Sequence, residues 1–199
     1  MKKIKDIWNN KELRCGGYYE LAMEVSSNKE IEPVKELTKQ VFQCDFVHGP
    51  FNSNFELVEL DLEYFDNLGY IEIEDKKVPF KTFNVPEEGN EGSNWLDICV
   101  YTAIYEEIFG DEYQTWSTEG KWHKGYDNQL IRILNRLNSI YKIRIGVIGF
   151  EISGMYYLQN LRHKELTEND VSHTKFFVNK DEDLKSNNWN MVTQLVTNE

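Results

Sequence analysis

Long apolar runs are absent from this sequence of 199 residues. A helix that spans a bilayer needs roughly 20 predominantly apolar residues, and no uninterrupted run approaches that length. The basic residues Lys2, Lys3 and Lys5 are followed by Asp6 and two asparagines, where a signal peptide would carry its apolar core. The sequence therefore predicts neither a transmembrane helix nor a signal peptide, and no membrane partner.

Cysteine is also scarce. The three cysteines, Cys15, Cys44 and Cys99, lie at wide and unrelated spacings, and no CxxC pair occurs. An odd number of cysteines without close pairs argues against a disulfide framework and against a zinc knuckle. We expect reduced thiols and a cytoplasmic protein.

Signatures of nucleotide binding and catalysis are missing. The IGVIG segment has the wrong spacing for GxGxxG, no helix follows it, and no lysine is placed as in a Walker motif. The GxSxG nucleophile elbow does not occur, and no two of the four histidines are spaced like the ligands of a metal site. These absences favour a protein that is not an enzyme and leave catalysis undecided.

Basic residues are nearly missing from the middle third of the chain. Residues 1–50 hold 8 bases and 8 acids, residues 51–120 hold 3 and 17, and residues 121–199 hold 11 and 9, which gives the net charge of −12. Such a negative field repels nucleic acid and anionic lipid and attracts a basic partner or a cation. The alternative is an acidic face that has no dedicated partner.

The apolar content, in contrast, is sufficient for a full core, since 40% of the residues are hydrophobic and 14% are aromatic. We expect one domain over residues 1–199, with a loose lead-in at 1–14 and a tail at 180–199 that could dock on it. The most strand-like run is YKIRIGVIGFEISG, from Tyr141 to Gly154, which predicts a strand in the middle of a sheet that is covered on both faces.

The remaining pattern indicates an α+β fold: a mainly antiparallel, twisted sheet of about six or seven strands with two principal helices on one face. Pro79 suggests that one of the strands lies at an edge of the sheet. Asp127 is expected to cap the second helix. The helices are predicted near 31–43 and 127–141, and the other strands at 18–25, 55–62, 69–74, 78–85, 95–101 and 174–178.

Three acids interrupt apolar, strand-like runs: Glu20 in YYELAMEV, Asp97 in WLDICVY and Glu151 in IGFEISG. A buried carboxylate is costly unless it is paired, protonated or bound to a metal. If the three strands are neighbours, the acids form a cluster that can hold a hard cation such as Mg²⁺ or Ca²⁺ or grip a basic ligand. The alternative is that each acid points outward from a solvated face.

Aromatic residues offer a second candidate ligand surface. Trp95, Trp116 and Trp122 could line a groove beside the loop at 111–126. Large aromatic side chains also serve as core or rim residues, which is the alternative reading of all three.

Three segments resemble motifs of an uncharacterised family of bacterial proteins. They are GYYELAMEV at 17–25, NWLDICVY at 94–101 and IGFEISG at 148–154, which match YELA, WLD and IGFE-V/I-SG strand motifs. After Asp97, ICVYTAIYEE replaces the leucine-rich continuation of that family. The resemblance implies a shared fold of the bacterial cytoplasm and no known activity.

The function that we expect from these features is that of a non-enzymatic binding protein. Its acidic surface would meet a basic protein partner, as bacterial immunity and antitoxin proteins do. The alternative is a ligand-binding domain or a metal-dependent enzyme that uses the strand carboxylates. The oligomeric state is not predicted.

Overall fold

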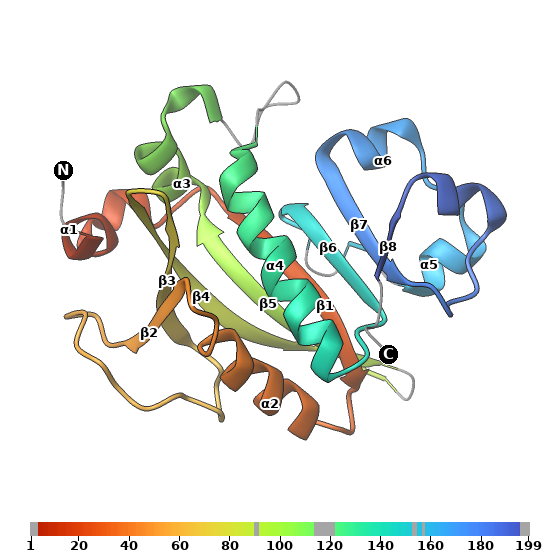
Figure 1. Ribbon diagram of the computed structural model, residues 1–199, viewed down its shortest axis with the longest axis horizontal. Coiled ribbons are helices and arrows are strands. Elements are labelled where there is room, and N and C mark those ends of the chain that lie inside the picture. Colours follow the sequence, from red (N-terminus) through yellow and green to blue (C-terminus); the bar gives the residue numbers. More distant parts are fainter. Residues whose placement is uncertain (1–3, 90–91, 114–121, 153–154, 157, 196–199) are drawn as a thin grey trace.

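The computed structural model describes residues 4–89, 92–113, 122–152, 155–156 and 158–195. Its strands form one sheet in the order β2-β3-β4-β5-β1-β6-β7-β8, in which every neighbouring pair is antiparallel except the parallel pair β7 and β8 (Figure 1). The fold class is therefore α+β, as predicted. The strands are β1 (Tyr18–Ser27), β2 (Val47–Phe51), β3 (Asn67–Ile73), β4 (Lys76–Pro86), β5 (Ser93–Tyr101), β6 (Ile145–Phe150), β7 (Thr174–Asn179) and β8 (Thr193–Leu195).

The two principal helices lie on one face of the sheet, as predicted (Figure 1). In α4, Leu130, Leu134 and Leu137 are buried at helical spacing, and they belong to the same apolar cluster as the buried side chains of α2. The helices of the described chain are α1 (Ile4–Asn9), α2 (Glu32–Val41), α3 (Thr102–Phe109), α4 (Lys124–Ile140), α5 (Leu158–His163) and α6 (Glu168–His173). None of them is long and apolar enough to cross a membrane.

The N-terminus of α4 differs from the prediction. The N-cap is His123, whose Nδ1 accepts a hydrogen bond from the backbone N–H of Tyr126 at 3.3 Å. Asp127 lies within the first turn and is buried. The helix starts earlier because a histidine nitrogen can accept the bond that an aspartate usually accepts at this position.

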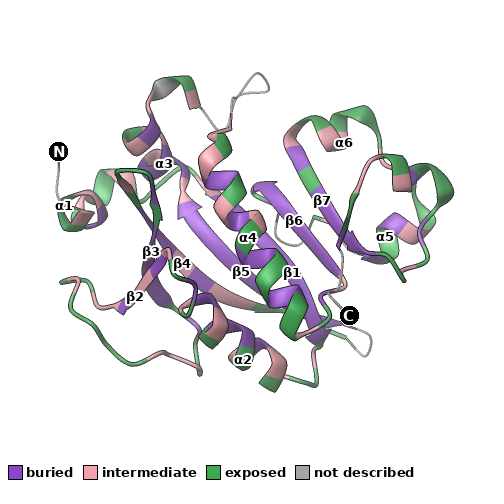
Figure 2. Cartoon of the chain, in the orientation of Figure 1, coloured by how far each residue is buried: buried purple, intermediate pink, exposed green. Residues whose placement is uncertain are grey.

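The central strand β6 is covered on both faces, as its apolar sequence predicts. Ile148 faces the large cluster under α2 and α4, while Ile145 and Val147 belong to a smaller apolar cluster with Leu158 and Leu161 of α5. Figure 2 shows the central strands as buried and the outer sides of the helices as exposed. The first described helix and the last described strand pack on this core, through Trp8 of α1 and Leu195 of β8.

Among the described residues the sheet has eight strands, where about six or seven were expected. The short strands β2 and β8 carry too few residues for a recognisable alternation. The predicted strand at 55–62 is wrong, since this stretch is a loop that makes a single isolated bridge between Phe51 and Leu57. Phe55 has a φ of 59°, which interrupts an extended chain, and Leu57 is 74% exposed.

Pro79 does not mark an edge strand, because β4 lies between β3 and β5. Pro79 is opposite Tyr70 of β3, whereas the pairing of β4 with β5 begins only at Lys81. The proline therefore lies outside the part of β4 that is paired on both sides. Within that part, its missing N–H would cost a hydrogen bond.

Candidate functional site

Neighbouring central strands bring two of the three predicted acids together. Glu20 of β1 lies opposite Cys99 of β5, and Asp97 is two residues before Cys99 and so on the same face. Each of these three residues offers one possible metal-ligand atom, and the three atoms all lie within 4.8 Å of one another. All three residues are buried. We call Glu20, Asp97 and Cys99 the acid–thiol cluster.

Hydrogen bonds order the cluster. The Cys99 thiol donates to Glu20 Oε2 at 3.2 Å, and Glu20 Oε1 accepts the backbone N–H of Ile152 at 2.8 Å. Burial, and then the charges of Glu20 and Asp97, raise the pKa of the Cys99 thiol well above its usual value. The thiol is therefore protonated at neutral pH and acts as a donor, not as a nucleophile.

Glu151, the third predicted acid, has a different position. It follows the end of β6 with a φ of 50°, it is exposed, and its Oε1 accepts the backbone N–H of Tyr18 at 2.8 Å. A Cβ on Gly17 would lie 2.3 Å from that oxygen, so the contact requires glycine there. Glu151 thus fastens the start of β1 to the end of β6.

Cys99 was missed as a partner of the acids. Its position two residues after Asp97 in a strand was a usable signal, because residues at i and i+2 share a face. Two carboxylates and a thiol can bind a divalent ion, and the sulfur favours Zn²⁺ over the Mg²⁺ or Ca²⁺ that three carboxylates would suit.

The predicted tryptophans do not form one groove. Trp95 is buried in the smaller apolar cluster, and its Nε1 donates to Glu87 Oε1 at 2.6 Å. Trp122 packs on the opposite face, where its ring stacks on Tyr19 at 4.7 Å between centroids. Trp116 lies outside the described residues. Trp95 and Trp122 are therefore separated by the sheet.

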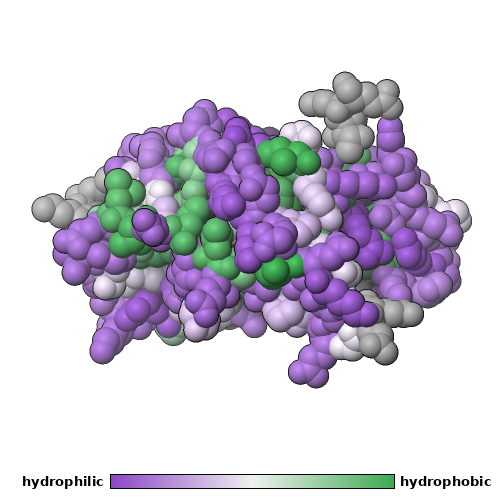
Figure 3. Space-filling model, turned by 90° about the horizontal axis from the view of Figure 1, so that it is seen from below, coloured by the Kyte–Doolittle hydropathy of each residue, from purple (hydrophilic) through white to green (hydrophobic). Residues whose placement is uncertain are grey.

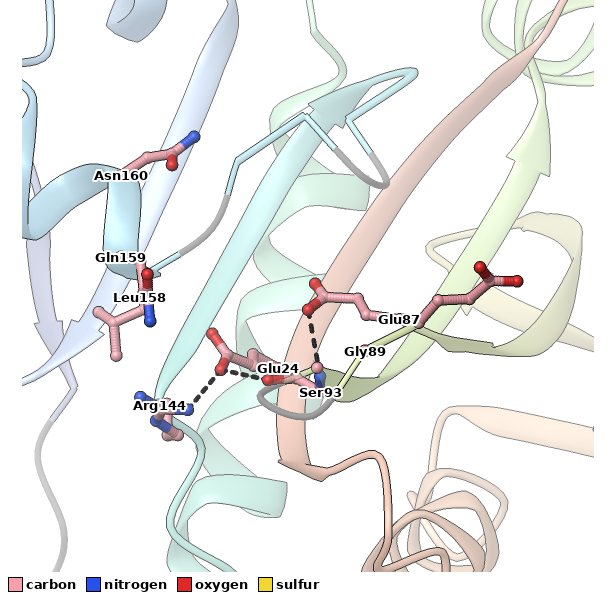
Figure 4. A pocket seen from close by; sticks show the side chains of 10 residues that line it. Glu24, Glu87, Gly89, Ser93, Arg144, Leu158, Gln159 and Asn160 are labelled. Atoms are coloured by element: carbon pink, nitrogen blue, oxygen red, sulfur yellow. Dashed lines mark hydrogen bonds and ion pairs between the residues drawn. The ribbon is translucent and has the colours of Figure 1, made fainter.

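A cleft of about 540 Å³ opens between the end of β1, residues 87–89 and 92–93, and the start of α5 (Figure 4). Among its lining residues are three carboxylates and one guanidinium, which sum to a formal charge of −2. We call it the glutamate cleft. The charged lining residues are Glu24, Glu87, Glu88 and Arg144, and Ser93, Leu158, Gln159 and Asn160 also contribute.

Glu24 is the buried acid of this cleft. Its Oε1 accepts from Arg144 Nη1 at 2.6 Å and from the Ser93 hydroxyl at 2.8 Å (Figure 4). Burial raises the pKa of Glu24 above its usual value, although the hydrogen bond from Ser93 and the charge of Arg144 act in the opposite direction. The surplus of carboxylates makes the cleft suitable for a cationic group and unsuitable for phosphate.

A further group of acids lies in the loop between β2 and β3, where Glu56, Glu59, Glu63 and Asp66 are exposed. Residues 52–66, which we call the acidic loop, hold five carboxylates and no lysine or arginine. The side chains of Leu57 and Tyr64 in this loop are each 74% exposed.

The chain matches no protein-family model, and comparisons with curated proteins and with solved structures likewise give no match.

Proposed function

We propose that this chain is a non-enzymatic binding protein of the bacterial cytoplasm that presents an acidic surface to a basic protein, in the manner of immunity and antitoxin proteins. The observation that carries this proposal is the charge of residues 40–75, which contain nine carboxylates and no lysine or arginine. These residues run from the end of α2 through β2, the acidic loop and β3, which lie at one end of the sheet (Figure 1).

Few of these nine carboxylates are neutralised within the chain. In the described part of the structure, Asp45 pairs with Arg132 and Asp66 with Lys81, and Glu72 Oε2 lies 3.2 Å from His48 Nε2. The other six have no ion pair among the described residues, so their field extends into solvent. An exposed field of one sign accelerates and orients the association with a partner of the opposite sign.

The test is affinity capture from a lysate of the source cells on the immobilised protein. We expect one or a few basic proteins to be retained at about 0.1 M salt and released towards about 1 M, where the screening length falls from about 10 Å to about 3 Å. An unrelated protein of equal net charge is the control. Retention that does not change with salt, or equal retention on the control, would contradict the proposal.

A second candidate function is divalent metal binding, which the geometry of the acid–thiol cluster favours. An ion there would need Cys99 to lose its proton, so binding would release a proton and would strengthen as the pH rises. The buried position suits an ion with a structural role better than one that must reach a substrate.

Thermal unfolding separates this candidate from the first. We expect Zn²⁺ to raise the melting temperature of the wild type more than Mg²⁺ or Ca²⁺ does, and EDTA to reverse the shift, because a ligand that binds only the native state stabilises it. The variant Cys99→Ser should lose the response to Zn²⁺. If none of the three ions shifts the wild type, the metal site does not exist.

A further inference from the structure

We propose that the acidic loop is the docking surface for a cationic amphipathic segment of a partner protein, one that carries lysine or arginine beside apolar side chains. This inference deepens the proposed function and rests on it. Five carboxylates lie in the loop, and large apolar side chains among them face solvent: Leu57 and Tyr64 are each 74% exposed and Val58 is 44% exposed.

The loop is ordered by its own hydrogen bonds. Asn52 Oδ1 accepts the backbone N–H groups of Asn54 and Glu56 at 2.8 and 3.1 Å. Asp61 Oδ1 accepts those of Glu63 and Tyr64 at 2.9 and 2.8 Å. A surface that is already ordered loses little conformational entropy when a partner binds.

The loop is also anchored to the body of the protein. Phe65 is buried in the main core, and the Asn67 side chain both donates to the carbonyl of Asp61 at 2.9 Å and accepts the Asp61 N–H at 2.7 Å. Leu57 and Tyr64 stay exposed to solvent, although Phe65, the neighbour of Tyr64, is buried. Because the loop is anchored, this exposure belongs to its folded conformation.

Charge identifies the occupant as cationic. Asp66 pairs with Lys81, whereas Glu59 and Glu63 form no ion pair with any described residue. A second copy of the chain would bring another net charge of −12 to this surface and would be repelled. A cation without apolar groups would leave Leu57 and Tyr64 in water.

The adjacent sheet edge favours side-chain docking over the addition of a strand. β2 is the outermost strand at this end, but it has only five residues, includes Gly49 and Pro50, and is already bridged to the loop through Phe51 and Leu57. Short, proline-containing edges pair poorly with another strand. Figure 3 views the molecule from the side of α2 and the acidic loop, where apolar groups lie among polar ones.

The experiment uses two fluorescent peptides of equal length and equal lysine content, one with leucine and one with serine at the remaining positions. Fluorescence anisotropy measures the Kd of each for the full chain. We expect the lysine–leucine peptide to bind at least about tenfold more tightly, because the apolar side chains of the loop contribute only with that peptide.

Two variants locate the site. Leu57→Ser with Tyr64→Ser should weaken the lysine–leucine peptide about tenfold and leave the lysine–serine peptide unchanged. Glu59→Gln with Glu63→Gln should weaken both peptides and reduce their dependence on salt. All four side chains are on the surface, so circular dichroism and the melting temperature should match those of the wild type.

Matched control variants account for the general effects of surface charge and surface hydrophobicity on peptide binding. Glu165→Gln with Glu168→Gln deletes two exposed carboxylates near α6, and Ile140→Ser deletes an apolar side chain that is 48% exposed on α4. Both should bind the peptides like the wild type.

The outcomes separate this inference from the proposed function. Equal binding of the two peptides, or equal losses in the loop and control variants, would overturn docking at the loop while leaving a basic partner possible elsewhere. Binding of neither peptide would count against both proposals. Sedimentation that shows self-association abolished by Leu57→Ser with Tyr64→Ser would instead make a second copy the occupant and overturn the inference.

Discussion

Replacement of Lys175 by methionine should destabilise the protein far more than its exposed position suggests. Lys175 Nζ pairs with Oδ2 of Asp127, whose other oxygen accepts the Tyr19 hydroxyl at 2.6 Å. The Asp127 side chain is 2% exposed, and that of Lys175 is 44% exposed. The three residues join α4, β7 and β1, and β1 also carries Glu20 of the acid–thiol cluster.

The size of the expected stability loss follows from the difference in burial between Asp127, which is buried, and Lys175, which is partly exposed. Lys175→Met leaves a buried carboxylate without its cation, which costs about 3–5 kcal/mol. We expect about 3 kcal/mol, because water can enter where the lysine was partly exposed and the first turn of α4 also favours a negative charge. Asp127→Asn should cost only about 1–2 kcal/mol, because its amide oxygen still accepts the Tyr19 hydroxyl and Lys175 can return to solvent.

The double variant provides the decisive comparison. Once Asp127 is asparagine, Lys175→Met removes no charge partner, so the double variant should be about as stable as Asp127→Asn alone. Urea unfolding followed by tryptophan fluorescence gives the free energies, with similar m-values expected for all variants. Lys180→Met, at an exposed position after β7, is the control and should change stability by less than about 0.5 kcal/mol. A cost below about 1 kcal/mol for Lys175→Met would refute the reasoning.

Three further results are expected. Gly146→Ala places a Cβ 2.8 Å from both Leu134 methyl carbons, so urea unfolding should show a loss of about 1–3 kcal/mol; an unchanged midpoint would mean that α4 can shift. Burial raises the pKa of Glu24 above 4.5, so Glu24 takes up a proton more readily in the folded state than in the unfolded state. The bound proton therefore stabilises the folded state fully below that pH, and this stabilisation is lost as the pH rises through the raised pKa. The unfolding free energy of the wild type minus that of Glu24→Gln should therefore fall as the pH rises above about 4.5, and a difference independent of pH would contradict the shift. A thiol reagent should modify only the exposed Cys15 in the native protein and all three cysteines in urea; rapid native reaction of a second thiol would be inconsistent with this packing.

Much of the local structure was predictable, because it depends on residues that are close in the sequence. The alternation at 18–25 and the apolar run around 145–150 identified β1 and β6, and the leucine stripe identified α4. The strand predicted at 95–101 likewise corresponds to β5. The charge of the middle third is a property of the sequence alone.

The sites depended on which segments the fold brings together. Glu20 and Asp97 are neighbours because β1 pairs with β5, and this pairing also adds Cys99 and leaves Glu151 at the end of β6. The glutamate cleft joins four segments that are distant in sequence, which no local pattern could indicate.

Burial was the other property that only the tertiary structure decided. A similar mixture of acids and apolar residues is buried from Tyr19 to Ser26 of β1, whereas Glu56, Leu57, Val58 and Glu59 in the acidic loop are exposed. The reason is physical: a periodic pattern states which side chains share a face, whereas the long-range packing of other strands and helices determines whether that face is removed from water.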